Sequence, residues 1–406
     1  LSSQKIIQLR MHIDNKILLE RGVESVVVKE ELEKKLNSKK KLRIKLGIDP
    51  TGSDLHIGHT VVLRKLRQFQ DAGHTAILLI GDCTARIGDP TGKSESRVML
   101  TEKDVKKNME HYIEQASKIL DIKKLEIRYN SEWFNKMTMA DILELTAKKT
   151  VNQTLHREDF KNRYKEGQEI SIVEILYPLM QGYDSVMLDC DVELGGRDQI
   201  FNMLVGRDLQ KAYECKKIQD VLTLPILEGL DGVEKMSKSL NNYIGINESP
   251  KEIYGKTMSI PDNLIIKYFD LVTEVPTEEI RELEKALASG QNPKNLKMRL
   301  ARELVTLFHN KKSADEAEKE FTEIFSNKGL PEDIELKKIT EKKINIVDLV
   351  INVGFASSKG ETRRLIEGGG VRIDKEKVTS PDFVVDVSKE VLLQVGKRKF
   401  IRVISK

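Results

Sequence analysis

Cysteine, proline and long apolar runs are all scarce in this chain of 406 residues. The longest apolar runs, such as residues 76–80 (AILLI), fall far short of the ~20 residues that a membrane-spanning helix needs. The three cysteines (Cys83, Cys190 and Cys215) are too scattered for a C-x-x-C motif, and we expect reduced thiols in a cytoplasmic protein. Glycine (25) and proline (10) are too few for a collagen-like or low-complexity chain. A soluble protein remains, and at roughly 100–200 residues per domain its length predicts two to four domains.

Common metal and nucleotide motifs are also missing. The seven histidines form no H-E-x-x-H box, and we predict no protein-bound metal. Residues 88–94 (GDPTGKS) have three residues between their glycines where a P-loop needs four, which excludes that motif. Because no G-x-G-x-x-G fingerprint is present either, a dinucleotide-dependent dehydrogenase is unsupported.

Positive charge is concentrated at the C-terminal end. The whole chain has 68 Lys/Arg and 64 Asp/Glu, a net charge of +4. Residues 341–406 alone have 14 Lys/Arg and 9 Asp/Glu, a net charge of +5, so the remainder is nearly neutral. Solvated surface lysines would explain such an excess by themselves, but basic clusters also suit a polyanionic partner.

The first ~245 residues alternate strand-like and helix-like segments, the pattern of an α/β fold. A strand at 42–48, a helix at 55–71 and a strand at 76–80 predict a βαβ unit and a parallel sheet. After Pro250 charged amphipathic helices dominate, and in the tail short helices are followed by β-rich segments. Further elements are expected as follows: a helix opened by Thr101, a helix at 198–213, a strand at 221–227, and helices at 277–287, 296–308, 346–353 and 359–367.

His56-Ile57-Gly58-His59 falls just inside the first predicted helix, where the carboxyl end of a strand meets a helix N-terminus. Two imidazoles one turn apart suit hydrogen bonds to phosphate oxygens, and the glycine lets a flat nucleotide approach the backbone. By itself such a pair is more often an ordinary pair of surface histidines.

Lys235-Met236-Ser237-Lys238-Ser239 follows a predicted strand and two glycines that can hinge a loop, Gly229 and Gly232. Two lysines and two hydroxyls on a mobile loop suit a departing polyphosphate. A K-x-x-K pattern alone would be interpreted as a solvated charge run.

These two motifs, in this order around a Rossmann-like sheet, resemble the class I aminoacyl-tRNA synthetases. Residues 81–90 (GDCTARIGDP), 177–184 (YPLMQGYD) and 192–199 (VELGGRDQ) are similar to the bacterial tyrosyl enzymes, and residues 356–373 resemble an S4 RNA-binding module. The resemblance implies a Rossmann-like catalytic domain at 1–245 with an inserted connective segment at about 98–190. It also implies an α-helical anticodon-recognition domain at 246–340 and a small α+β S4-like domain at 341–406.

The resemblance further implies ATP-dependent activation of L-tyrosine to tyrosyl-adenylate and transfer to the terminal adenosine of tRNA(Tyr). Mg²⁺ would accompany the ATP phosphates, and the enzyme would be a homodimer. Carried over to this chain, the tyrosine site consists of Asp49, Thr84, Asp89, Tyr177, Gln181, Asp184 and Gln199. Within it, Tyr177, Asp89 and Gln181 would hold the ammonium, and Asp184, two helical turns after Tyr177, would accept the phenol proton.

The remaining site residues follow from the same resemblance. The catalytic set is His56, His59, Thr51, Lys93, Arg97, Lys235 and Lys238. The ATP site is His56, Gly58, His59, Gly196, Asp198, Lys235, Met236, Ser237 and Lys238. The RNA-binding residues are Lys359, Arg363, Arg364 and Arg372.

Two positions depart from the family pattern. Lys45 stands where family members carry a tyrosine that reaches the substrate phenol, and Arg197 stands where serine or threonine is commoner. Three alternatives remain: a tryptophan-activating relative, an RNA-binding protein without catalysis, and a small-molecule adenylating ligase. Asp184 and the S4-like tail argue against the first, the two intact motifs against the second, and the RNA-binding tail against the third.

Overall fold

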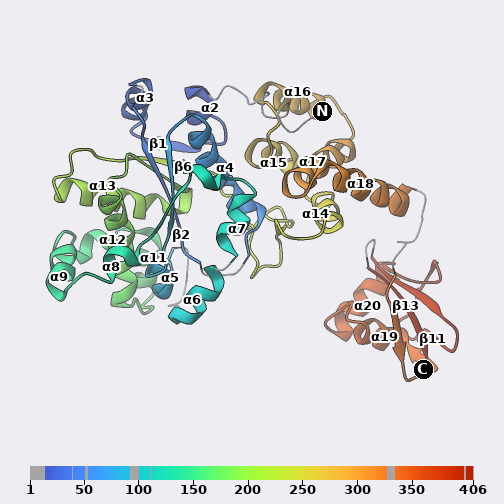
Figure 1. Cartoon of the computed structure of the whole chain (residues 1–406). Helices are drawn as coiled ribbons and strands as arrows, with labels where there is room; N and C mark the ends of the chain where they lie inside the picture. The colour runs from blue at the N-terminus through green and yellow to red at the C-terminus, as the bar shows by residue number, and fades with distance from the viewer. Residues whose placement is uncertain are drawn as a thin grey trace. The chain divides into compact units, whose positions relative to one another are not determined.

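The computed structural model has two compact units, residues 1–318 and residues 319–406 (Figure 1). It describes residues 14–38, 40–50, 54–91, 100–109, 111–326, 334–396 and 399–405. None of the helices in these ranges is long and apolar enough to cross a membrane.

The first unit is built on a six-stranded sheet in the order β1-β6-β5-β2-β3-β4. Its strands are β1 Ser25–Val27, β2 Arg43–Ile48, β3 Thr75–Ile80, β4 Glu126–Tyr129, β5 Val192–Gly196 and β6 Asp220–Leu224. All neighbours are parallel except the edge pair β1 and β6, which is antiparallel. The predicted α/β class with a parallel sheet is therefore confirmed, and β1 adds an antiparallel edge strand.

The predicted βαβ unit is β2, α4 (Ile57–Asp71) and β3. β3 is buried along almost its whole length, as a continuous apolar run predicts for a central parallel strand. The helix α4 packs against β2, β3 and β5, and its buried face includes Leu63, Leu66 and Phe69. This arrangement places the histidine motif at the carboxyl edge of the sheet, where ligands of open α/β sheets bind.

The other helices of the sheet-containing part lie around the sheet, with α12 and α13 near each other and in contact (Figure 1). They are α2 Asn15–Leu19, α3 Lys29–Asn37, α5 Thr84–Ile87, α6 Glu102–Met109, α7 Tyr112–Ser117, α8 Ser131–Phe134, α9 Met139–Ala147, α10 Val151–Thr154, α11 Glu158–Lys165, α12 Ile172–Met187 and α13 Ile200–Ala212. Short 3₁₀ turns lie at Ile122–Lys124, Arg197–Gln199 and Asp262–Leu264. The single helix expected after Thr101 is two helices, α6 and α7, and the helix expected from 198 begins with a 3₁₀ turn.

After residue 245 the structure describes a helical segment, as predicted. Its helices are α14 Pro250–Thr257, α15 Ile265–Val272, α16 Thr277–Ala288, α17 Pro293–Phe308 and α18 Lys311–Ser326. The helix α17 begins three residues before the predicted start, because the Asn292 side chain accepts a hydrogen bond from Lys294 N and Pro293 occupies the first turn.

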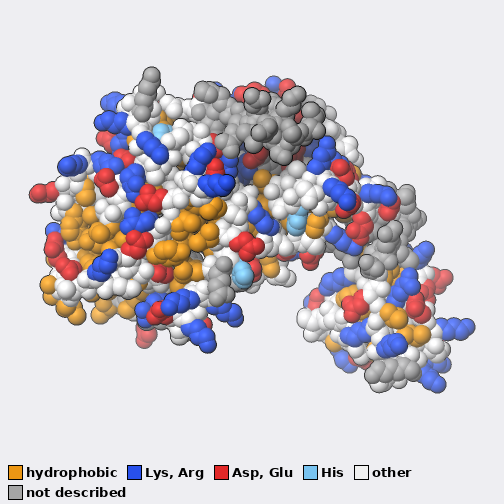
Figure 2. All heavy atoms as spheres, in the orientation of Figure 1, with side chains coloured by type: hydrophobic (Ala, Val, Ile, Leu, Met, Phe, Trp, Pro, Cys, Tyr) orange, Lys and Arg blue, Asp and Glu red, His pale blue; other side chains and the backbone are white. Residues whose placement is uncertain are grey.

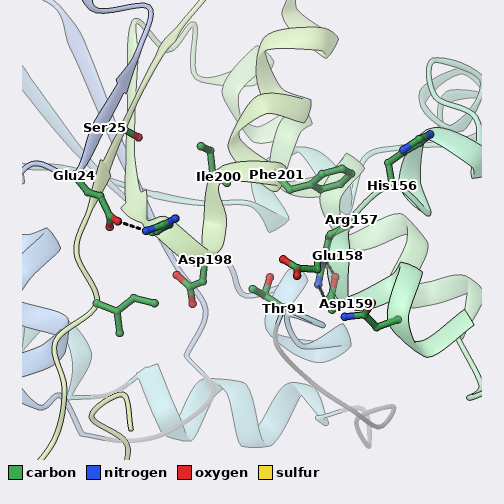
Figure 3. Close-up of a pocket in the computed structure, with 13 residues that line it drawn as sticks. Glu24, Ser25, Thr91, His156, Arg157, Glu158, Asp159, Asp198, Ile200 and Phe201 are labelled. Carbon is green, nitrogen blue, oxygen red and sulfur yellow. Dashed lines mark hydrogen bonds and ion pairs between the residues drawn. The ribbon is translucent and has the colours of Figure 1, made fainter. Parts of the chain in front are cut away.

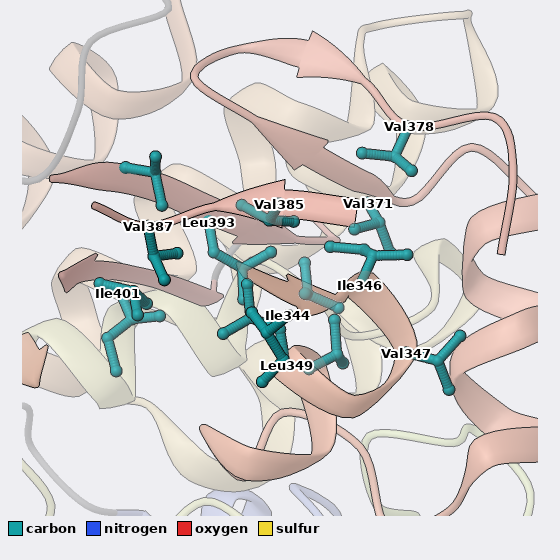
Figure 4. Packing of buried hydrophobic residues seen from close by; sticks show 14 of the residues in the cluster. Ile344, Ile346, Val347, Leu349, Val371, Val378, Val385, Val387, Leu393 and Ile401 are labelled. Atoms are coloured by element: carbon teal, nitrogen blue, oxygen red, sulfur yellow. The ribbon is translucent and has the colours of Figure 1, made fainter. Parts of the chain in front are cut away.

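The second unit packs two helices, α19 Ile346–Asn352 and α20 Lys359–Glu367, with short strands. Its strands are β7 Leu336–Ile339, β8 Lys343–Asn345, β9 Val371–Ile373, β10 Glu376–Lys377, β11 Val384–Asp386, β12 Val391–Val395 and β13 Lys399–Ser405. Ile346 and Leu349 from α19 pack with Val371, Leu393 and Ile401 from the strands (Figure 4). Both predicted tail helices are present, and α20 has the predicted bounds.

Candidate active site

A cavity of about 370 Å³ opens at the carboxyl ends of β2 and β5, beside α12. Its walls carry most of the polar residues that the sequence analysis placed in a tyrosine and ATP site. Among its lining residues are Lys45, Asp49, His59, Thr84, Asp89, Tyr112, Tyr177, Gln181, Asp184, Glu193, Gly196, Asp198, Gln199 and Lys235. Residues from distant parts of the chain therefore meet in one polar cavity.

Asp49, directly after β2, is the centre of one wall. The Tyr177 hydroxyl donates to Asp49 Oδ2 at 2.8 Å, and the Thr84 hydroxyl donates to Asp49 Oδ1 at 2.7 Å. Gly81 makes this approach possible, because a Cβ there would lie 2.1 Å from Asp49 Oδ1. Burial, and next the charge of Asp49, raise the pKa of Tyr177 well above its ordinary value, so its phenol stays protonated.

Asp184 lies at the buried end of the cavity, with only 3% of the residue exposed. The indole nitrogen of Trp133 donates to Asp184 Oδ1 at 3.0 Å, and Asn130 Nδ2 lies 3.5 Å from Oδ2. Burial raises the pKa of Asp184 to about 8, although Lys45 and these donors favour the carboxylate. Trp133, the only tryptophan of the chain, is thus in direct contact with the residue predicted to recognise the phenol.

Asp89 and Gln199, which also line the cavity, are joined by a hydrogen bond. Gln199 Nε2 donates to Asp89 Oδ2 at 2.6 Å, and the Thr91 hydroxyl donates to Asp89 Oδ1 at 2.6 Å. Asn202 Nδ2 donates to Gln181 Oε1 at 3.0 Å, which orients the amide of Gln181. These contacts hold the predicted ammonium-binding residues in place before any substrate arrives.

The histidine motif opens α4. His59 Nδ1 accepts from the backbone nitrogen of His56 at 3.2 Å, and the two imidazole centroids are 3.8 Å apart. His56 Nδ1 is buried and has no hydrogen-bond partner in the structure. Burial lowers the pKa of His56 to about 2 and that of His59 to about 4, so both rings are neutral and can donate to a ligand without carrying charge.

The lysine motif lies against the histidine motif. Ile57 N donates to Ile244 O at 2.9 Å, and an added Cβ on Gly58 would lie 3.5 Å from Cβ of Met236. Lys238 Nζ is 2.9 Å from Asp54 Oδ2, and Lys235 Nζ is 3.9 Å from Asp198 Oδ2. Both side chains are partly exposed, and Lys235 lines the cavity.

A second cavity, of about 960 Å³, shares Asp198 with the first (Figure 3). Its walls include Thr91, Arg157 and Phe201. Arg197, the second departure from the family pattern, also lines this cavity and makes an ion pair with Glu24 at 2.6 Å. Its guanidinium is thus held by a carboxylate of the larger cavity.

The four predicted RNA-binding residues lie in the second unit. Lys359, Arg363 and Arg364 are exposed on α20, whose Thr362 and Ile366 are buried, and Arg372 is exposed on β9. Lys359 also forms an ion pair within the unit, because its Nζ is 2.8 Å from Asp348 Oδ1. Three exposed cations on one amphipathic helix are compatible with binding to a phosphate backbone.

Most predicted site residues that the structure describes gather at the two cavities or beside them. Thr51, Lys93 and Arg97 lie outside the described residues. The sequence analysis missed Asn130, Trp133, Asn202 and Glu193, which contact predicted ligands; the unique tryptophan was the one signal that could have pointed to them. Within the described ranges, no group of three or more His, Cys, Asp or Glu side chains could hold a metal ion.

Comparisons with known proteins agree with this geometry. Residues 37–326 match the family model of class I tRNA synthetases (W and Y), and residues 346–391 match the S4 domain. The tyrosine–tRNA ligase of Moorella thermoacetica is 52% identical over 390 residues, which cover 95% of this chain and 94% of the relative. That of Thermotoga maritima is 51% identical over 387 residues, covering 95% of this chain and 96% of the relative.

Solved structures show the same likeness. A C-terminally truncated mitochondrial tyrosyl-tRNA synthetase of Aspergillus nidulans is 26% identical with a TM-score of 0.65, covering 79% of this chain and 97% of that one. The Archaeoglobus fulgidus tyrosyl-tRNA synthetase complexed with L-tyrosine is 25% identical with a TM-score of 0.61, covering 74% of this chain and 98% of that one. The resemblance found in the sequence is thereby confirmed: this chain belongs to the tyrosine–tRNA ligase family of the class I tRNA synthetases, and it carries an S4 domain.

Proposed function

We propose that this protein activates L-tyrosine with ATP and transfers it to tRNA(Tyr). The observation that carries the proposal is the single polar cavity that joins the predicted phenol acceptor Asp184 to Lys235 and the histidine motif. A tyrosine bound with its phenol at Asp184 and its ammonium near Tyr177 and Gln181 directs its carboxylate toward Asp49 and Gln199.

The reaction requires no nucleophile from the protein. The tyrosine carboxylate attacks the α-phosphorus of ATP, forms tyrosyl-adenylate and displaces pyrophosphate. Neutral His56 and His59 donate hydrogen bonds to phosphate oxygens, and Lys235 and Lys238 neutralise charge that grows on the leaving pyrophosphate. Catalysis is thus positioning and charge stabilisation.

Mg²⁺ is proposed to arrive with the ATP phosphates, as is usual for this ion. Phosphate oxygens and water suit its hard-ligand preference better than the imidazoles and ammonium groups of the phosphate-facing wall. When bound, the ion would neutralise part of the phosphate charge, and the protein residues would act as described above.

The second cavity is proposed to receive the 3′ end of the tRNA. It shares Asp198 with the first cavity, so a ribose hydroxyl entering there can approach the adenylate. Phe201 and Ile200 offer apolar surface for a base, and Arg157 and Arg197, each paired with a carboxylate, can hydrogen-bond a ribose or base. The hydroxyl then takes the tyrosyl group, and AMP leaves.

The exchange of pyrophosphate into ATP tests the amino-acid assignment. We expect tyrosine to support exchange and the other nineteen amino acids to support little or none, because tyrosine alone carries a hydroxyl donor at the end of an aromatic ring that can reach Asp184. Exchange with tryptophan in place of tyrosine would overturn the proposal in favour of the nearest relative.

The three predicted domains are proposed to divide the work. Residues 1–245 would catalyse activation, the helical segment 246–340 would recognise the anticodon, and the basic residues 341–406 would bind RNA. Deleting residues 344–406 should leave pyrophosphate exchange unchanged and weaken tRNA charging, since the deleted segment carries the excess of positive charge. An equal fall in both activities would contradict this division.

A homodimer is proposed on the side of the first unit that carries α9 to α12. Hydrophobic side chains gather on that part of the surface (Figure 2). Exposed members from consecutive helices are Met139, Ile142, Leu143, Val151, Tyr164 and Ile172. Scattered apolar residues are ordinary on a surface, but so many on adjacent helices favour a protein partner, here a second copy. Sedimentation at a mass of one chain would contradict the dimer.

A cytoplasmic location stays a prediction from the cysteines.

A further inference from the structure

Lys45, the first departure from the family pattern, forms an internal ion pair at the floor of the tyrosine cavity. It lies on β2 in register with Glu193 on β5, so both side chains extend from the same face of the sheet. Lys45 Nζ is 2.9 Å from Glu193 Oε1, and the two residues are 0% and 1% exposed. A fully buried ion pair is costly to maintain unless further hydrogen bonds satisfy it.

Those hydrogen bonds are present. Lys45 Nζ also donates to the Ser185 hydroxyl at 2.7 Å and to the backbone oxygen of Gln181 at 3.1 Å. Glu193 Oε2 accepts from the Ser185 hydroxyl at 3.1 Å and from Gln219 Nε2 at 2.6 Å. An ammonium has three protons, and all three are used by these acceptors, so Lys45 has none left for a substrate phenol.

Lys45 therefore acts on the substrate through other residues. Its hydrogen bonds to Gln181 and Ser185 link α12 to the sheet at two positions, three residues before Asp184 and one residue after it. Its charge is also the largest influence that favours the Asp184 carboxylate against burial. Three other titratable groups interact with Asp184. The charge of Asp49 opposes the ionisation of Asp184. Besides burial, the charge of Asp184 in turn raises the pKa of Tyr177 and of Cys83.

We propose that the Lys45–Glu193 pair is a positioning device for tyrosine, in which Glu193 fixes the ammonium and the ammonium keeps Asp184 ready to accept the phenol proton. The chain thus places a buried positive charge behind the contact between Asp184 and the phenol. This inference rests on the proposed tyrosine-activating function.

Two variants should move the pH dependence of tyrosine binding in opposite directions. Lys45→Met combined with Glu193→Gln removes both charges, so the midpoint of the binding profile should rise by about one pH unit and affinity at neutral pH should fall about tenfold. Glu193→Gln alone leaves the ammonium uncompensated beside Asp184, so the midpoint should fall. The fluorescence of Trp133, the only tryptophan, reports binding, and pyrophosphate exchange separates KM from kcat.

The matched control is Lys65→Met, which removes another buried lysine. Lys65 donates to the backbone oxygens of Ile17, Leu18 and Arg21, away from the tyrosine cavity. This variant should lose thermal stability without shifting the midpoint, and Lys45→Arg should keep the parent profile because it keeps the charge.

The outcomes are separable. A parent chain that shows no exchange with tyrosine would overturn the proposed function. A parent chain that exchanges normally, with both variants keeping its midpoint, would overturn the positioning role alone. If the double variant does not fold, Glu193→Gln decides the matter, since loss of packing cannot improve binding at low pH.

Discussion

Replacing Lys235 or Lys238 with alanine should lower the rate of pyrophosphate exchange by about 10²–10³-fold, the usual cost of removing one preorganised charge-stabilising group. The two ammonium groups lie beside Asp198 and Asp54, at 3.9 and 2.9 Å, and both side chains are partly exposed. Negative charge moves onto pyrophosphate only as the α-phosphorus bond breaks, so the loss should appear in kcat. Steady-state exchange at saturating ATP and tyrosine measures it.

The control for this prediction is Lys312→Ala on α18. Lys312 is 86% exposed and has a weak ion pair with Glu316 at 3.8 Å, so exchange should be unchanged. Tyrosine affinity should also stay unchanged in the Lys238 variant, because Lys238 does not line the tyrosine cavity. Exchange within a few-fold of the parent in both alanine variants would be incompatible with the proposed role of this loop.

Asp184→Asn should raise the KM for tyrosine by roughly 10- to 150-fold, which corresponds to about 1.5–3 kcal/mol for a hydrogen bond to a charged group. Activity with phenylalanine, which has no phenol hydroxyl, should change much less. Exchange assays with both amino acids therefore give the loss of discrimination directly. Asp189→Asn is a matched control, because Asp189 is exposed and its positive φ of 47° suits asparagine.

The parent chain should also bind tyrosine more weakly as the pH falls below about 8. Burial raises the pKa of Asp184 to about 8, so at lower pH the unliganded carboxyl group is protonated and loses the charge that strengthens its hydrogen bond to the phenol. The dissociation constant should rise by up to tenfold per pH unit below 8 and be constant just above it. Asp184→Asn should remove this dependence, and a parent profile that is flat between pH 6 and 8 would refute it.

Local patterns in the sequence were sufficient for most of the framework. The pattern of apolar and polar residues predicted β2, α4 and α20, and a continuous apolar run predicted β3, because each signal lies within a short segment. One predicted helix is two in the structure, α6 and α7. The histidine and lysine motifs were found from residue type and spacing alone.

The geometry of the site depended on the tertiary structure. Residue spacing does not reveal that Trp133 and Asn130 donate to Asp184, since α8, with the residue before it, and α12 are brought together only by the fold. The neutral state of His56 and His59 likewise follows from burial, which no local pattern reports.

The sequence by itself determined the α/β class, the two motifs and the family to which the chain belongs, because these depend on short segments and their order. It marked Lys45 as a departure without giving its role. Only the tertiary structure revealed its partner, because Lys45 and Glu193 are 148 positions apart and meet through the register of two parallel strands. A buried charge is tolerable only where such a partner is supplied, and the fold supplies it at the floor of the tyrosine cavity.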